Sequence, residues 1–100
     1  MDPITLLSRA EKELAAGRPA RALPLLSRAA RPGRDPFFQA DGHHRRAEAL
    51  RELSRFEEAL EDYGRAHRLY RLSGAEGEGF RALLGASACL RVLSRYRRAD

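Results

Sequence analysis

The stretch LRELSRF at residues 50–56 returns as LRVLSRY at residues 90–96, a shift of 40 positions. A second overlay, at a shift of 37, carries Arg-Ala-Glu of residues 9–11 onto residues 46–48. The same shift also matches Arg18, Ala22, Leu23, Arg28 and Ala29 to Arg55, Ala59, Leu60, Arg65 and Ala66. Two independent overlays within 100 residues predict a repeat protein, whose units bury their apolar faces against their neighbours.

The repeated units are predicted to be helical. Ala, Leu, Arg and Glu dominate and β-branched residues are scarce, a composition that favours helices over strands. Asp2-Pro3 and Asp35-Pro36 each place a capping acid before a proline, which is the preferred order at a helix start. Gly17 can take the left-handed conformation that ends a helix, and Pro19 can open the next one. Each unit therefore reads as a pair of helices.

Later helix starts are predicted from serines. Ser54 and Ser73 are each followed by a glutamate three residues on, the spacing of a capping box, and so open the fourth and fifth helices. The fifth helix is expected to end at Leu93, with Ser94 starting a sixth. In the second helix, Pro24 predicts a bend or a late start, because proline lacks the backbone amide donor.

The pattern resembles the tetratricopeptide repeat family, in the bacterial form with extended first helices, over nearly the whole chain. That family sets small residues where the two helices of a unit cross. The matching residues are Ala10 with Ala22 and Ala29, then Ala47 with Ala59 and Ala66. The resemblance implies an all-α fold, an α–α superhelical solenoid of antiparallel helix pairs with about 2.5 repeats. The single domain would hold repeats at about 2–34 and 35–72 and a truncated repeat at about 73–100.

The resemblance also implies a binding surface. In this family the first helices of the units line a concave groove that receives a peptide or a helix. By position the groove residues here are Leu7, Glu11, His44, Glu48, Arg51, Arg81, Leu84 and Arg91. The implied function is that of a scaffold or adaptor, which binds a protein partner of acidic character through this groove or through the exposed terminal helix. The alternative for these residues is plain packing or solvation.

Groups suited to catalysis or metal binding do not converge in the sequence. His43 and His44 are adjacent, so they point about 100° apart on a helix, and His67 lies on another helix. The single cysteine, Cys89, falls in an apolar stretch and reads as a buried, inert thiol. The acidic side chains within residues 57–62 are predicted to form a solvent-exposed face near the start of a helix. We therefore predict no enzyme activity, no cofactor and no metal site.

The net charge of +5 suits an acidic protein partner or nucleic acid. Nucleic-acid binding is the alternative function. Its candidate residues are Arg45, Arg46, Arg65, Arg68, Arg71, Arg95, Arg97 and Arg98. Interleaved acids, without a helix-turn-helix or an aromatic platform, favour protein binding instead. The sequence contains no apolar run of about 18 residues and therefore predicts no membrane span. The lone cysteine and the acidic start predict a cytoplasmic location.

The third unit lacks most of its second helix. Its first helix carries Phe80, Leu83, Leu84, Leu90 and Leu93, a face without a covering helix. Leaving such side chains exposed to water costs about 1.5–3 kcal/mol of folding free energy each. We therefore expect either a fragment of a longer repeat protein or a chain that self-associates through this face.

Overall fold

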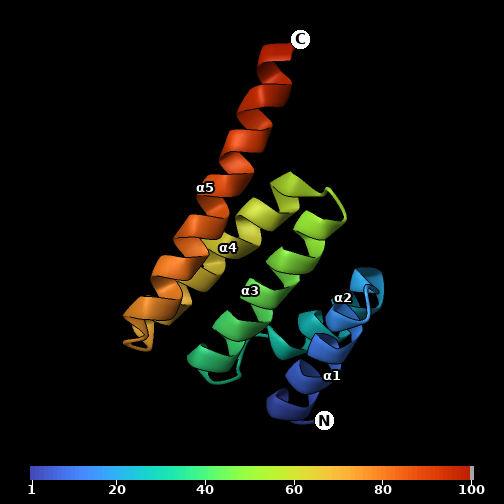
Figure 1. Ribbon diagram of the computed structural model, residues 1–100. Coiled ribbons are helices and arrows are strands. Elements are labelled where there is room, and N and C mark those ends of the chain that lie inside the picture. Colours follow the sequence, from blue (N-terminus) through green and yellow to red (C-terminus); the bar gives the residue numbers. More distant parts are fainter. Residues whose placement is uncertain (100) are drawn as a thin grey trace.

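The computed structural model describes the backbone of residues 1–99 and the side chains of residues 1–96. In this described part the chain forms five α-helices and no strand, which confirms the all-α prediction (Figure 1). The helices are α1 (Pro3–Ala15), α2 (Pro19–Ala29), α3 (Pro36–Glu52), α4 (Phe56–Leu72) and α5 (Glu76–Ala99). None of them, within these residues, is long and apolar enough to cross a membrane.

The predicted capping acids begin α1 and α3. Asp2 Oδ1 accepts a hydrogen bond from the Thr5 amide at 2.9 Å, and Asp35 Oδ1 accepts one from the Phe37 amide at 2.9 Å. A proline occupies the first turn of both helices. The prediction of a late start at Pro24 is wrong, because α2 begins at Pro19 and continues through Pro24.

The two predicted capping boxes are wrong, because both serines belong to the ends of helices. Ser54 has φ +61° and follows the last turn of α3, and the Arg55 amide donates to the Leu50 carbonyl at 2.8 Å. Gly17 and Gly74, both with φ +74°, hold the same left-handed place after α1 and α4. Ser73 ends α4, and its hydroxyl donates to the Leu69 carbonyl at 2.9 Å. Left-handed helix ends, not capping boxes, therefore shape these turns.

The predicted helix start at Ser94 is also wrong. α5 runs without a break from Glu76 to Ala99, past the expected end at Leu93. At residues 50–56 the chain turns, and Phe56 then packs against the core. At residues 90–96 nearly the same sequence stays helical, which keeps every backbone hydrogen bond and avoids a left-handed serine. The side chains of Arg97, Arg98 and Ala99, and all of Asp100, lie outside the described residues.

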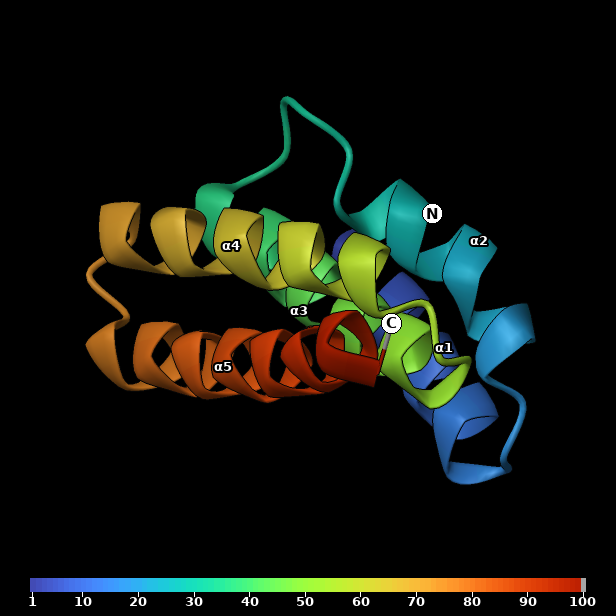
Figure 2. The same cartoon turned by 90° about the horizontal axis from the view of Figure 1, so that it is seen from above.

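The helices form two layers. Each helix packs against the next along the chain, and α3 also contacts α1 and α5. Seen from above, α1, α3 and α5 make one layer while α2 and α4 make the other (Figure 2). α5 runs antiparallel to α4 and extends well past the first turn of α4 (Figure 1). The first helices of the predicted units therefore share one side of the molecule.

Two clusters of buried residues form the core. The larger joins α3, α4 and α5 around Tyr63 and Tyr70, and the smaller joins α1, α2 and α3 around Leu26. The small residues predicted at the helix crossings are all fully buried, namely Ala10, Ala22, Ala29, Ala47, Ala59 and Ala66. Alanine has no side chain beyond Cβ, so these positions let the helix axes approach closely.

Candidate binding groove

Two adjoining hollows lie between α3 and α5. The first, of about 240 Å³, is lined by Asp41, His44, Arg45, Glu48, Tyr70, Glu78 and Arg81. The second, of about 280 Å³, is lined by His44, Glu48, Arg51, Tyr63, Arg81, Leu84 and Gly85. His44, Glu48 and Arg81 line both hollows, which therefore form one continuous surface, here called the α3–α5 groove.

Helical spacing explains which side chains reach the groove. On α3, Asp41, His44, Glu48 and Arg51 stand three or four positions apart and so share one face. α5 supplies the facing wall, with Arg81 as its central residue. α3 and α5 run in the same direction along the groove (Figure 1), so each wall presents its residues in sequence order.

The floor of the groove consists of two tyrosines from α4. Tyr63 and Tyr70 are buried, and the His44 ring meets them edge-on, with centroid distances of 5.6 Å and 5.9 Å. The Tyr70 hydroxyl donates a hydrogen bond to the Asp41 carboxylate. Burial raises the pKa of Tyr63 to about 12 and raises the pKa of Tyr70 further above its ordinary value. Both hydroxyls therefore keep their protons at neutral pH.

Gly85 lets α5 settle onto this floor. A Cβ at this position would lie 2.4 Å from Cε1 of Tyr63, well inside van der Waals contact. Because Tyr63 is only 1% exposed, its ring has little room to move away. The glycine thus sets the distance between the Tyr63 ring and the α5 wall.

His44 sits at the centre of the groove as a neutral ring. Burial lowers its pKa, and the nearby Glu48 carboxylate opposes that effect in part. The distance from His44 Nε2 to Glu48 Oε1 is 3.7 Å, longer than a hydrogen bond. A neutral imidazole carries one donor and one acceptor nitrogen, so it can bind a polar group of either kind.

The charges of the groove are ordered from one end to the other. Asp41 and Glu78 line the first hollow, whereas Arg51 lines the second, with its guanidinium 5.8 Å from the Tyr63 ring centroid. Arg45, on the rim of the first hollow, pairs with Glu11 of α1 at 2.8 Å. The first hollow is lined by three carboxylates and two guanidinium groups, and the second by one carboxylate and two guanidinium groups, so the balance of charge changes from negative to positive along the groove.

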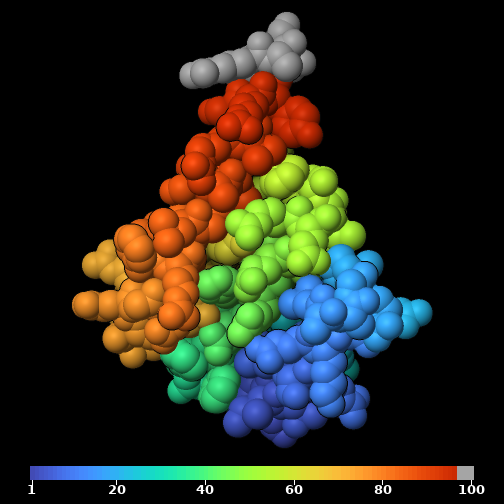
Figure 3. All heavy atoms as spheres, in the orientation of Figure 1, coloured from blue at the N-terminus to red at the C-terminus, as the bar shows by residue number. Residues whose placement is uncertain are grey.

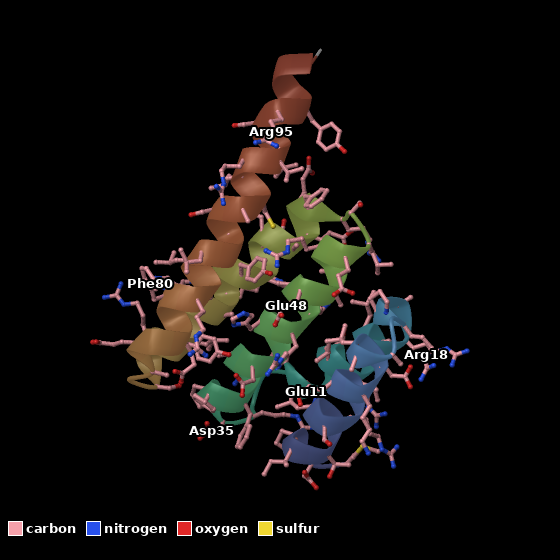
Figure 4. All side chains as sticks on the ribbon, viewed as in Figure 1. Glu11, Arg18, Asp35, Glu48, Phe80 and Arg95 are labelled. Carbon is pink, nitrogen blue, oxygen red and sulfur yellow. The ribbon has the colours of Figure 1, made fainter. Side chains whose placement is uncertain are left out.

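The structure brings together most of the predicted groove residues. His44, Glu48, Arg51, Arg81 and Leu84 line the two hollows. Glu11 reaches the rim through Arg45, and Glu11 and Glu48 face the same side of the molecule (Figure 4). Leu7 instead packs against the smaller core cluster. Arg91 lies apart, in a separate hollow with Leu90, Ser94 and Arg95.

Several lining residues were missed by sequence reasoning. They are Asp41, Arg45, Tyr63, Tyr70, Glu78 and Gly85. Asp41 and Arg45 could have been found from their spacing to His44 and Glu48. The tyrosines could not, because their placement on an apolar stripe indicates only that they are buried. Their exposure to the groove depends on how far apart α3 and α5 stand.

A second polar cluster lies between α3 and α4, outside the groove. Asp62 is 2% exposed, so the prediction that it belongs to a solvated face is wrong. Its carboxylate accepts a hydrogen bond from His43 Nδ1 at 2.9 Å, with Arg46 and Arg65 nitrogens at 3.6 Å and 3.8 Å. A buried carboxylate needs such partners. His43 therefore has a structural role, which ties α3 to α4.

Within the described residues, no group of three or more histidines, cysteines or acids is placed to hold a metal ion. Cys89 is fully buried and burial raises the pKa of its thiol, so it stays protonated. No family model, curated protein or solved structure matches this chain. Its function is therefore inferred from the geometry of the groove.

Proposed function

We propose that this chain is a protein-interaction module that holds a segment of a partner protein in the α3–α5 groove. The observation that carries the proposal is the groove itself, a continuous surface with an aromatic floor and charged walls. Buried tyrosines supply apolar area together with polar groups at the edge, a combination that is common in protein interfaces.

The size of the hollows supports a peptide ligand. With volumes of about 240 and 280 Å³ that open onto each other between α3 and α5, they form a groove along the surface and not a pocket that encloses a ligand. Two adjoining hollows instead suit two successive side chains of one bound segment. An amphipathic helix places such side chains one turn apart, at i and i+3 or i+4.

The order of charges supports a particular kind of segment. Asp41 and Glu78 favour a basic residue at one end of the ligand. Arg51, which lines only the second hollow, favours an acidic residue near the other end. The ligand class we propose is therefore a short helix with a central apolar residue between a basic and an acidic one.

The architecture supports a tetratricopeptide-like arrangement, which we propose as the fold of the described residues. Alternate helices lie in the same layer, and the alanines predicted at the crossings of the first two pairs are fully buried. Their counterpart in the third unit, Ser87, is exposed. A reducing, cytoplasmic location also belongs to this proposal, because the only cysteine is buried and protonated.

The test is a selection of binders from a phage-displayed random peptide library, followed by affinity measurement for the selected peptides. Arg51→Glu combined with Arg81→Glu should weaken binding by about tenfold or more, because both arginines line the groove. The matched control is Arg68→Glu with Arg71→Glu. These two exposed arginines of α4 lie outside both hollows, so the same change of net charge should leave affinity unaltered.

Two outcomes would contradict the proposal. Peptides selected against the wild-type chain that bind the groove variant equally well would place the binding surface elsewhere. If instead the chain binds single-stranded DNA at physiological salt and the α4 control variant loses that binding, the nucleic-acid alternative is the better function.

A further inference from the structure

α5 carries a row of exposed apolar side chains on its outer side. Phe80, Leu83, Leu84 and Leu90 are 62%, 43%, 55% and 53% exposed, and the small Ser87 lies among them. Phe80 points away from α3 (Figure 4). We call these five residues the outer stripe. A row of exposed apolar side chains on one helix is a candidate surface for contact with another protein.

The outer stripe lies opposite the face that α5 buries. Ala82, Gly85 and Cys89 are buried on the side that packs against α4. Ser87 stands five positions after Ala82, and Phe80 two before it, which places both roughly half a turn away. α5 is thus apolar on two opposite faces, as is usual for a helix that lies between two layers.

The internal repeat indicates what the outer stripe can bind. At the shift of 40, Ser87 and Leu90 correspond to Ala47 and Leu50 of α3. Both of these α3 residues are fully buried in the core cluster shared with α4. The outer stripe is therefore the counterpart of the α3 surface that already accepts a helix.

We propose that the outer stripe binds the same stripe of a second copy of this chain, with the two α5 helices antiparallel. Ser87 lies at the centre, and Leu84 and Leu90 stand three positions before and after it. A small residue at the centre allows two helices to approach closely, while the flanking leucines pack across the axis. Such a surface is self-complementary, as twofold symmetry requires.

Charge decides the direction of the pairing. Glu76 lies at the start of α5 on the same face as Ser87, whereas Arg91 and Arg95 lie near its end on the flank of the stripe that carries Leu84; all three are exposed. In an antiparallel pair, Glu76 of one copy lies near Arg95 of the other, and the contact occurs twice. A parallel pair would set like charges side by side and align the helix dipoles unfavourably.

The shape of the molecule leaves this surface open. α5 contacts α4 and α3 on its inner side, and its C-terminal turns project beyond the other helices (Figure 3). A partner helix can therefore lie along the outer stripe over most of its length. Of the stripe residues, Leu84 also lines the α3–α5 groove, so substitutions at Leu83 and Leu90 separate the two surfaces best.

The test is sedimentation velocity over a dilution series at low salt. The wild-type chain should show a concentration-dependent monomer–dimer equilibrium. Leu83→Glu combined with Leu90→Glu should weaken the dimer by about a hundredfold, because two apolar contacts per copy are replaced by charge. Helicity measured by circular dichroism serves as the folding control.

Charge reversal tests the antiparallel arrangement itself. Glu76→Arg alone and Arg95→Glu alone should each weaken dimerisation several-fold at low salt. An equimolar mixture of the two variants should recover dimerisation, because both Glu76–Arg95 contacts become opposite charges again. A wild-type chain that stays monomeric at all concentrations would overturn the proposal, and so would a mixture that shows no recovery.

Dimerisation through the outer stripe and peptide binding in the groove can be tested independently. The variant with Leu83→Glu and Leu90→Glu should still bind selected peptides, because neither residue lines the groove. The variant with Arg51→Glu and Arg81→Glu should still dimerise. Loss of dimerisation in the second variant would overturn the assignment of the dimer to the outer stripe.

Discussion

At the scale of single residues, Ser54 stands out by its backbone. Within the part of the chain that the structure describes, it is the non-glycine residue with a positive φ, at +61°. It occupies the place that Gly17 and Gly74 hold after α1 and α4. Its side chain makes no capping hydrogen bond to α4, whose N-cap is Arg55. A left-handed conformation costs an L-residue roughly 1–2 kcal/mol, and packing of α4 against α3 must offset that cost.

Ser54→Gly is therefore expected to stabilise the protein. Glycine removes the left-handed strain but loses more chain entropy, so the net gain in the free energy of unfolding is about 0.5–1 kcal/mol. Urea denaturation followed by circular dichroism measures it. If Ser54 capped α4 after all, the same change would be neutral or destabilising, and Gly74→Ala provides the reverse comparison at φ +74°.

At the scale of elements, the packing of α2 against α3 depends on one close approach. A Cβ on Gly42 would lie 2.7 Å from the backbone nitrogen of Ala30, at the end of α2. Backbone atoms cannot rotate aside as a side chain can, so the two helices would have to separate. Gly64, in the middle of α4, faces open space instead, and a methyl group there would meet nothing within 4 Å beyond the backbone of its own helix.

We predict opposite effects for the same substitution at these two glycines. Gly42→Ala should lower the free energy of unfolding by about 1–3 kcal/mol through overpacking. Gly64→Ala should raise it by about 0.5–1 kcal/mol, because alanine is the better helix former. Thermal melts of both variants measure the difference, and equal effects would contradict the close approach of α2 and α3.

At the scale of the whole molecule, the two core clusters must be coupled if the chain unfolds as one unit. Leu23 of α2 is half-buried and packs against both clusters, whereas Leu25 packs against the smaller one alone. Tight coupling between neighbouring helices is what makes unfolding of a repeat array cooperative. Leu23 therefore links the α1–α2 pair to the rest of the chain.

Leu23→Ala is expected to reduce cooperativity as well as stability. Because the side chain is half-buried, the loss in the free energy of unfolding is about 1–2 kcal/mol, with a smaller denaturant m-value as α1 and α2 open first. Hydrogen exchange should show faster exchange in α1 and α2 than in α4. The control, Leu25→Ala, should lower stability with the m-value unchanged, and a lowered m-value in both variants would refute the special role of Leu23.

The candidate site was predictable from the sequence only in part. Helical spacing places His44, Glu48 and Arg51 on one face, and the repeat relates α3 to α5. The groove floor was not predictable, because an apolar stripe shows that Tyr63 and Tyr70 are buried and not which surface they border. Arg91 lies outside the two hollows, because position in a repeat fixes the face of a helix, and not whether another helix stands opposite.

Local chemistry and spacing were enough to predict the helical class, the capped starts at Asp2 and Asp35 and the alanines at the crossings. The conformation of the repeated heptapeptide, in contrast, depends on what packs around it. At residues 50–56 it turns, because α4 packs back onto α3 and offsets the strain at Ser54. At residues 90–96 it remains helical within α5. Without that packing, the continuous helix has the lower free energy.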